Sequence, residues 1–336
     1  MSAHANLAIA GFVVIAAMIS AYVLLDGFDL GVGAIALWIG KSDRERAAAM
    51  QSIGPFWNGN EVWLIAAGGA LFALFPRAYA SSFSGFYLPF IVVLWLLMFR
   101  GIALELRNHF PSELWHQFWD VAFSLSSALL IAIFGVALGN LLRGLPLDSF
   151  GYFQGTFAFL LNPYALATGF FALVILANHG AAFLALRVDG ELEERARALQ
   201  GPLWWIQLVT FTGITVGTFF VRGTPPLFFT AATVAVALAA LIAMRAFHRR
   251  ALTVATFAAS CAFIVALLIA AASSMFPYLL PGYPLGSGGL SIYDAVPSAL
   301  SLACALAVTI GGGVAVVAYG TVVASKMGGK VRVDAG

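Results

Sequence analysis

Long apolar runs, separated by short polar breaks, recur from one end of the chain to the other. Each run has about 20 residues or more, the length that an α-helix needs to cross the hydrocarbon core of a bilayer. The pattern predicts an all-α integral membrane protein with nine spanning helices. Their expected bounds are Leu7–Ile39, Met50–Phe75, Tyr79–Leu106, Trp119–Leu142, Pro163–Leu186, Pro202–Val221, Leu227–Phe247, Leu252–Met275 and Ser298–Ser325.

The composition excludes a water-soluble protein. Of the 336 residues, 62% are hydrophobic and 10% are charged, whereas soluble domains carry about 25% charged residues. The first apolar run lacks the basic segment of a signal peptide and exceeds its length, so we expect it to remain as the first span. Cys261 and Cys304 lie alone in late runs, which indicates core residues and no metal site. The dispersed basic residues give no sign of nucleic-acid binding.

The basic residues predict an orientation. When the 17 Lys and Arg residues are sorted onto alternate sides of nine spans, only Arg77, Arg143 and Arg222 fall on one side. The positive-inside rule makes the other side cytoplasmic. We therefore expect a periplasmic N-terminus and a cytoplasmic C-terminus in a bacterial-type inner membrane.

A weak internal repeat divides the chain. Gly54-Pro55-Phe56-Trp57 and Gly201-Pro202-Leu203-Trp204 each follow a charged segment, and they stand about 150 residues apart. We interpret residues 1–150 and 151–297 as two related four-helix bundles, and residues 298–336 as a ninth helix with a cytoplasmic tail. The alternative is a chance match of a short motif in an apolar chain.

Ionisable side chains gather in the first half only. A charge at the centre of a span costs roughly 2.5 to 3.5 kcal/mol, so each one needs a reason. Asp26 and Asp29 stand three residues apart on the first predicted helix, and Asn58 and Glu61 stand three residues apart on the second. Each pair therefore projects from one side of its helix. We expect Arg100 to be the counter-ion of Asp29 or Glu61. The candidates, all toward the predicted cytoplasmic ends, are Asp26, Asp29, Asn58, Glu61, Arg100 and Glu105.

The residues alone leave two explanations open for this cluster. Carboxylates in a poorly solvated site exchange protons, so the cluster suits a proton-uptake route from the cytoplasm. The other explanation is a structural ion-pair knot that locks three helices together.

Three further side chains have alternative roles. Asp120, at the predicted start of the fourth helix, is either a functional acid or a carboxylate stabilised by the helix dipole. His179 lies inside a predicted span, where a core position is the alternative to a haem-ligand role. Trp57 belongs to a set of tryptophans near the predicted inner ends that an aromatic belt explains.

Three motifs together resemble subunit II of the cytochrome bd quinol oxidases. They are Asp26-Gly27-Phe28-Asp29-Leu30-Gly31-Val32-Gly33, Gly54-Pro55-Phe56-Trp57-Asn58-Gly59-Asn60-Glu61-Val62-Trp63-Leu64 and Phe83-Ser84-Gly85-Phe86-Tyr87. The resemblance continues, in the family's order, through Arg100-Gly101, Trp119-Asp120, Gly139 to Gly144, Leu161-Asn162-Pro163 and Tyr293-Asp294-Ala295. The compact loop between the sixth and seventh helices is similar to that of the cyanide-insensitive branch.

The resemblance implies a heterodimer with a haem-bearing subunit I. That partner would carry two haems b, a haem d or a third haem b, and the quinol-oxidising loop, while this chain would bind no haem. The complex would oxidise ubiquinol and reduce dioxygen to water, taking protons from the cytoplasm without a pumping cycle. Lipid is also an expected partner, with or without a small single-helix subunit.

The resemblance also gives the acidic cluster a role. It implies a proton route toward the oxygen-reducing haem through Glu61, Asn58, Asp29, Asp26 and Glu105, supported by Arg100, Trp57 and Asp120. Some members have an aspartate at the position of Asn58, which cannot titrate. We therefore expect Glu61 to supply the exchangeable carboxylate.

Two other functions remain as alternatives. Repeats and intramembrane carboxylates are also typical of ion-coupled secondary transporters. Against a transporter, the charges lie toward one side and in one repeat, whereas carrier sites favour the midplane and draw on both. The third alternative is an assembly subunit whose charges only hold a partner.

Overall fold

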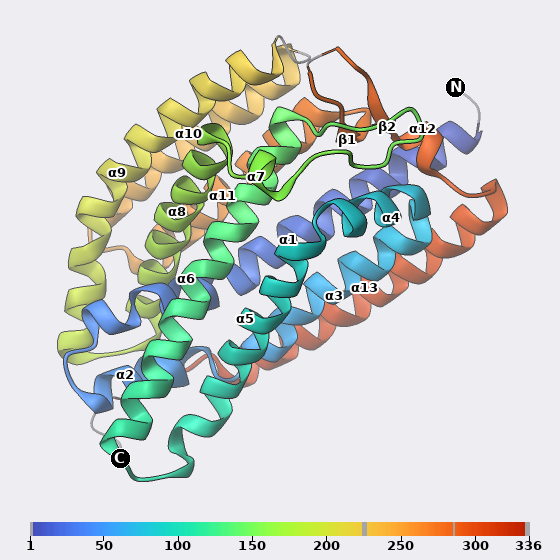
Figure 1. Ribbon diagram of the computed structural model, residues 1–336. Coiled ribbons are helices and arrows are strands. Elements are labelled where there is room, and N and C mark those ends of the chain that lie inside the picture. Colours follow the sequence, from blue (N-terminus) through green and yellow to red (C-terminus); the bar gives the residue numbers. More distant parts are fainter. Residues whose placement is uncertain (1–2, 224–226, 285, 333–336) are drawn as a thin grey trace.

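The computed structural model describes residues 3–223, 227–284 and 286–332, which form an elongated bundle of helices (Figure 1). Eight helices in this part are long and apolar enough to cross a membrane, so the chain is a multi-pass membrane protein. The helices are α1 (Ala3–Ile39), α2 (Asp43–Ile53), α3 (Trp57–Leu74), α4 (Pro76–Gly85), α5 (Tyr87–Leu106), η1 (Arg107–His109), α6 (Glu113–Arg143), α7 (Phe157–Leu160), α8 (Pro163–Arg187), α9 (Gly190–Arg222), α10 (Leu227–Arg249), α11 (Thr253–Met275), α12 (Ile292–Ala295) and α13 (Ala299–Met327).

All nine predicted runs fall on helices, but two runs are divided. The second becomes α2 and α3, which separate at Gly54-Pro55-Phe56, and the third becomes α4 and α5, which separate at Phe86. Pro55 restricts the backbone of Gly54 and donates no backbone hydrogen bond, which favours the end of α2 at this residue. Of the nine predicted spans, only the second has no counterpart among the eight long apolar helices. Its helix α3 is less apolar, because its first turns carry Asn58, Asn60 and Glu61.

Two of the undivided helices begin more than four residues earlier than expected. α6 begins at Glu113 rather than Trp119, and α9 begins at Gly190 rather than Pro202. In both cases charged residues continue the helix beyond the apolar run. The apolar pattern marks only the membrane-embedded part of a helix, so it could not locate these ends. The expectation that Cys304 is a core residue was also wrong, because it is exposed on α13.

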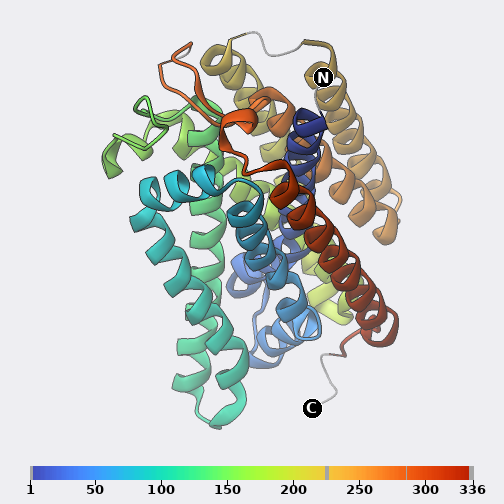
Figure 2. The same cartoon turned by 90° about the vertical axis from the view of Figure 1, so that its right-hand side faces the viewer.

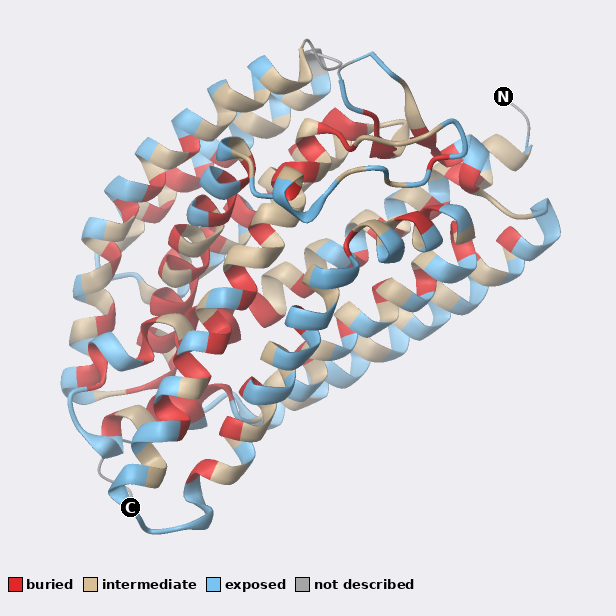
Figure 3. Cartoon of the chain, in the orientation of Figure 1, coloured by how far each residue is buried: buried red, intermediate tan, exposed pale blue. Residues whose placement is uncertain are grey.

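The helices α1, α6 and α8 form the centre of the bundle. α8 packs against α1, α6 and α9. In its most apolar 18-residue stretch 67% is buried, compared with 11% in that of α13. Exposed residues line the outer sides of α9 and α13 (Figure 3). α1 begins and α13 ends at opposite ends of the bundle (Figure 2).

Two glycines allow α1 and α8 to cross with their backbones in contact. A Cβ added to Gly31 would lie 1.9 Å from the carbonyl oxygen of Leu176, and one added to Gly180 would lie 2.3 Å from the backbone of Gly31. Small residues permit such close helix contacts in membranes. No side chain larger than hydrogen fits at either position while the helices keep this distance.

A layer of loops covers one end of the bundle. It contains α7, α12 and a hairpin of β1 (Tyr278–Pro281) and β2 (Gly289–Ser291), in which Leu280 faces Leu290. Arg77 donates to the carbonyl oxygens of Asp294 (2.9 Å) and Phe150 (3.0 Å) in this layer. Arg143, another of the three basic residues sorted to this side, lies 4.6 Å from the ring of Phe159 and 4.5 Å from that of Tyr283.

At the other end, α2 is fastened to the bundle through Glu45. Ser42 and Glu45 form a capping box at the start of α2. Glu45 also forms an ion pair with Arg195 of α9, and the Nε of Arg195 donates to the carbonyl oxygen of Ile39 at 2.8 Å. Burial acts to raise the pKa of Glu45, but hydrogen bonds from Arg195, Lys41 and Ser42 outweigh it and hold this pKa below its usual value of 4.5.

The lowered pKa of Glu45 predicts how the stability of this end varies with pH. Glu45→Gln keeps the capping box but loses the ion pair, so we expect it to lower the free energy of unfolding by about 1 kcal/mol at neutral pH. Because the folded-state pKa is depressed, this contribution is complete above pH 4.5 and is lost as the pH falls through the folded-state pKa. Thermal unfolding of the purified protein across this pH range measures it.

Glu191→Gln is the matched control. Glu191 pairs with the same Arg195 at 3.0 Å, but its side chain is 83% exposed, so we expect a negligible change. A difference between wild type and Glu45→Gln that persists unchanged on acidification would contradict the prediction.

Candidate functional site

Buried charged side chains from α1 and α5 meet near the start of α3. Asp26, Asp29 and Arg100 are completely buried. The Nη2 of Arg100 lies 2.7 Å from Asp26 Oδ1, and its Nη1 lies 3.3 Å from Asp26 Oδ2, so the contact is two-pronged. Asp29 is more distant, with Oδ2 at 3.8 Å from Nη2. The expected pairing of Arg100 with Asp29 is thus present as a longer contact, and the principal partner of Arg100 is Asp26, which was not expected.

Asn60, which the sequence analysis did not single out, completes this cluster. Its Nδ2 donates to Asp29 Oδ2 at 2.8 Å and to the carbonyl oxygen of Leu25 at 3.3 Å. Asn58 is exposed. The helical period distinguishes Asn60 from Asn58, because Asn60 lies on the buried face of α3 together with Trp63, Ala67, Ala70 and Leu74.

Polar atoms of the cluster keep free hydrogen-bonding capacity. Within the described residues, Asp29 Oδ1 and Arg100 Nε are buried and have no hydrogen-bond partner. Buried polar atoms are nearly always bonded, so two unbonded atoms in one ion-pair cluster are unusual. Proton transfer requires such available donors and acceptors.

Glu61 adds a third carboxyl group beside the cluster. It is half-buried on α3 and interacts electrostatically with Arg100 and Asp26. In the described part of the chain it has no hydrogen bond and no ion pair within 4 Å. Three carboxyl groups therefore share the single guanidinium of Arg100. A net charge in such a poorly solvated place is costly, so protons are the natural compensation.

Two other predicted residues lie at the edge of this arrangement. Glu105 is exposed near the end of α5 and contacts no member of the cluster. Trp57 is half-buried, and its ring lies 3.6 Å from the position of a Cβ built on Gly101. Trp57 thus fills the space between α3 and α5.

Asp120 belongs to a separate ion-pair network toward the α2 end of the bundle. Its carboxylate accepts from Arg107 Nε at 2.6 Å and Arg46 Nε at 2.8 Å, and Arg107 also pairs with Asp43 at 2.7 Å. Because α6 begins at Glu113, Asp120 lies two turns inside the helix. The helix-dipole explanation is therefore wrong, since the dipole acts mainly within the first turn. The network ties α2, η1 and α6 together.

His179 does not fit the role of a haem ligand. Its Nδ1 lies 2.7 Å from Ser260 Oγ, its Nε2 lies 3.1 Å from the carbonyl oxygen of Leu24, and its ring stacks on Phe257. Both ring nitrogens are thus already bonded inside the fold. Among the described residues there is also no group of three His, Cys, Asp or Glu side chains that could hold a metal ion.

A second buried contact, in the other half of the chain, resembles the cluster but uses neutral side chains. Asn178 stands two residues before Gly180, as Asp29 stands two residues before Gly31. Its Nδ2 donates to Gln207 Oε1 at 2.7 Å and lies 3.9 Å from Met244 Sδ.

The partners of Asn178 are placed much as the partners of Asp29 are. Gln207 follows Trp204 by three residues, as Asn60 follows Trp57. Met244 lies on α10, which packs against α11, as Arg100 lies on α5, which packs against α6. Each contact thus joins side chains from three helices, one with charges and one without.

Comparisons with known proteins agree with the resemblance found in the motifs. Residues 7–327 match the family "Cytochrome bd terminal oxidase subunit II". The chain is 31% identical to the cytochrome bd-I ubiquinol oxidase subunit 2 of Escherichia coli K12, over 87% of this chain and 86% of that protein. It is 35% identical to the cytochrome bd ubiquinol oxidase subunit 2 of Bacillus subtilis, over 59% of each chain.

A solved structure shares the fold. A chain of the bd oxidase from Geobacillus thermodenitrificans superposes with a TM-score of 0.78 at 16% identity, covering 97% of this chain and 100% of that one. The chain belongs to the family of cytochrome bd terminal oxidase subunit II, and it is therefore a subunit of an oxidoreductase complex.

Proposed function

We propose that this chain is the haem-free subunit II of a quinol oxidase, which stabilises subunit I and gives protons a route from the cytoplasm toward the oxygen-reducing site. The E. coli and B. subtilis relatives are named as ubiquinol oxidase subunits, which supports ubiquinol as the electron donor of the complex. We assign the haems to subunit I, because both ring nitrogens of His179 in this chain are already hydrogen-bonded and are not free to bind haem iron. We place the complex in the bacterial inner membrane.

One observation carries the proton route. The second half of the chain makes the contact between Asn178, Gln207 and Met244 without any charge. The helix packing therefore does not require Asp29 and Arg100 at the equivalent place. Charges that cost free energy in a membrane and that the fold does not need are best explained by function.

The geometry gives each group of the cluster a role. Asp26 and Arg100 form a fixed, two-pronged ion pair that supplies a constant local field. Asn60 holds one oxygen of Asp29 and leaves Oδ1 unbonded and available for a proton. Glu61, half-buried and unpaired among the described residues, takes protons up from the cytoplasmic side and passes them toward Asp29.

The remaining predicted residues support this route from its edges. Glu105 is exposed and would act as a proton-collecting carboxylate at the surface. Asn58 is exposed and not titratable, so it serves only to bind water. Trp57 keeps α3 and α5 apart, and the Asp120 network holds the cytoplasmic ends of α2 and α6 in place.

We further propose nine spans, with a periplasmic N-terminus, a cytoplasmic C-terminus, and bundles at residues 1–150 and 151–297. Corresponding packing supports the two bundles: α1 contacts α3 and α6 as α8 contacts α9 and α11, and α5 contacts α6 as α10 contacts α11. Helix α13 (within 298–336) follows them and packs on α1 and α3. The outer loop layer that holds Arg77 and Arg143 supports the orientation.

Isolation of the complex tests the function directly. We expect the tagged chain, purified gently from its native membrane, to bring a larger subunit with it. The dithionite-reduced minus oxidised spectrum should show haem bands, and ubiquinol should drive oxygen uptake. A colourless chain without a partner would contradict the proposal and favour a transporter.

Replacing Glu61 tests the proton route. We expect Glu61→Gln to keep subunit I and the haem spectrum but to slow oxygen uptake by about tenfold or more, since a positioned proton-transfer group contributes at least that much. Glu194→Gln is the control, because Glu194 is exposed on α9 and makes no contact with the cluster. Equal oxygen-uptake rates for wild type and Glu61→Gln would overturn the role of Glu61.

A variant whose cluster carries only neutral side chains distinguishes a proton route from a purely structural group of ion pairs. Arg100→Met alone leaves Asp26 and Asp29 buried without a counter-charge, at a cost of about 3–5 kcal/mol, so we expect little assembled complex. The quadruple variant Asp26→Ile, Asp29→Asn, Asn60→Gln and Arg100→Met copies the second half, and we expect it to assemble but to turn over slowly. Haem content per milligram and oxygen uptake measure the two effects. Failure of the quadruple variant to assemble, or its full activity, would contradict the proton route.

A further inference from the structure

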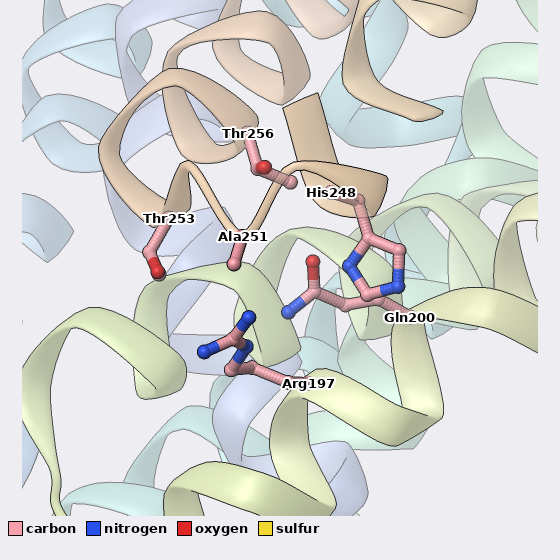
Figure 4. A pocket seen from close by; sticks show the side chains of 6 residues that line it. All are labelled: Arg197, Gln200, His248, Ala251, Thr253 and Thr256. Carbon is pink, nitrogen blue, oxygen red and sulfur yellow. The ribbon is translucent and has the colours of Figure 1, made fainter. Parts of the chain in front are cut away.

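The α9 to α11 region contains a basic pocket that the proposed function does not use. Its lining residues are Arg197, Gln200, His248, Ala251, Thr253 and Thr256, and the empty space between them, open solvent included, is about 160 Å³. A second hollow shares Gln200 and His248 with it and reaches Trp204, Met244 and Arg245. Figure 4 shows the amide of Gln200 between the guanidinium of Arg197 and the ring of His248.

The cations around this pocket have little compensation from carboxylates. No carboxylate lines either hollow. The carboxylate within ion-pair range of Arg197 is Glu193, at 4.0 Å, and Glu193 is held more closely by Lys330 at 2.6 Å. Arg245 has no ion pair in the described residues, and its buried Nε has no hydrogen-bond partner there. Arg249 and Arg250, on the adjoining turn, add further positive charge.

The backbone turn at the pocket satisfies its own carbonyl oxygens and leads directly into α11. Leu252 and Ala251 donate to the carbonyl oxygens of Phe247 (3.0 Å) and His248 (3.0 Å), which closes the end of α10 in a Schellman motif. The positive φ of 56° at Ala251 belongs to this turn. Helix α11 then begins at the pocket with no side-chain cap, so its first amides and positive dipole end favour an anion.

Gln200 points to a ligand that also carries a hydrogen-bond donor. Its side chain is 3% exposed, and its Oε1 is buried without a partner among the described residues. Its Nε2 is engaged by the carbonyl oxygens of Ala181 and Ala196. The free atom is therefore an acceptor, which a hydroxyl group satisfies and a halide does not. An amide oxygen could also bind a metal ion, but the arginines and the histidine around it disfavour a cation.

The fold does not need these polar residues. Gln200 and Arg197 precede Trp204 by four and seven residues, and the residues in those places before Trp57 are Ile53 and Met50. Both of these are buried apolar side chains. The basic pocket is thus a feature added to the second half alone.

We propose that this pocket binds the phosphate and headgroup hydroxyl of a phosphatidylglycerol-type lipid. Arg197, His248 and the start of α11 hold the phosphate, and Gln200 accepts a hydrogen bond from the glycerol hydroxyl. Exposed apolar side chains beside the pocket, Leu252 and Val254, lie where acyl chains would cover them. Basic pockets between helices at the cytoplasmic boundary suit anionic lipid headgroups.

Native mass spectrometry of the delipidated complex tests the proposal. Phosphatidylglycerol, phosphatidylcholine or inorganic phosphate is added back, and the fraction of complexes that retain one added molecule is measured. We expect retention of phosphatidylglycerol over phosphatidylcholine. Arg197→Gln with Arg245→Gln should weaken phosphatidylglycerol binding by about 30-fold, the effect of two cationic contacts at a membrane surface.

Arg44→Gln with Lys326→Gln is the matched control, because it removes two exposed cations from the same end of the molecule. An unchanged haem spectrum shows that each variant has assembled. Equal phosphatidylglycerol retention in the pocket variant and the control would overturn the proposal. If only inorganic phosphate binds, and if this binding is lost in the pocket variant, the pocket is a site for free phosphate and the lipid proposal is overturned.

Discussion

The crossing of α1 and α8 at Gly31 and Gly180 sets the position of nearly everything else in this protein. The two backbones touch there, and no side chain separates them. This contact between backbones fixes how far α1 and α8 can slide or rotate against each other. The buried polar contacts then follow on either side, with Asp29 just before one glycine and Asn178 just before the other.

The two buried polar contacts can be compared within the same chain. In both halves, an amide or carboxyl group on the central helix bonds to an amide on the next helix and approaches a long side chain on the third. One half uses Asp29, Asn60 and Arg100, and the other uses Asn178, Gln207 and Met244. The neutral version satisfies the same helix packing without buried charge. The charged version therefore has a cost that its architecture does not demand, and function is the natural reason for keeping it.

The two halves also differ in their charges at the end of the bundle where α2 lies. The first half uses ion pairs, with Asp120 held between Arg46 and Arg107, and this leaves its charges balanced. The second half gathers Arg197, Arg245 and His248 around a hollow without a carboxylate. Balanced charges fasten helices to one another, whereas unbalanced charges attract ligands from outside the chain. The proton-transfer and lipid-binding roles proposed for the two halves follow from this difference.

The sequence by itself determined the helical membrane class, the location of the apolar runs, the family and the acidic residues of the cluster. These depend on local composition and spacing, because a bilayer demands long apolar helices and makes each intramembrane charge conspicuous. Only the tertiary structure decided that Arg100 pairs with Asp26, that Asn60 rather than Asn58 reaches Asp29, and that Asp120 joins two arginines. Those pairings join residues on different helices, and they depend on the rotation and crossing of each helix, which close packing fixes and local sequence does not encode.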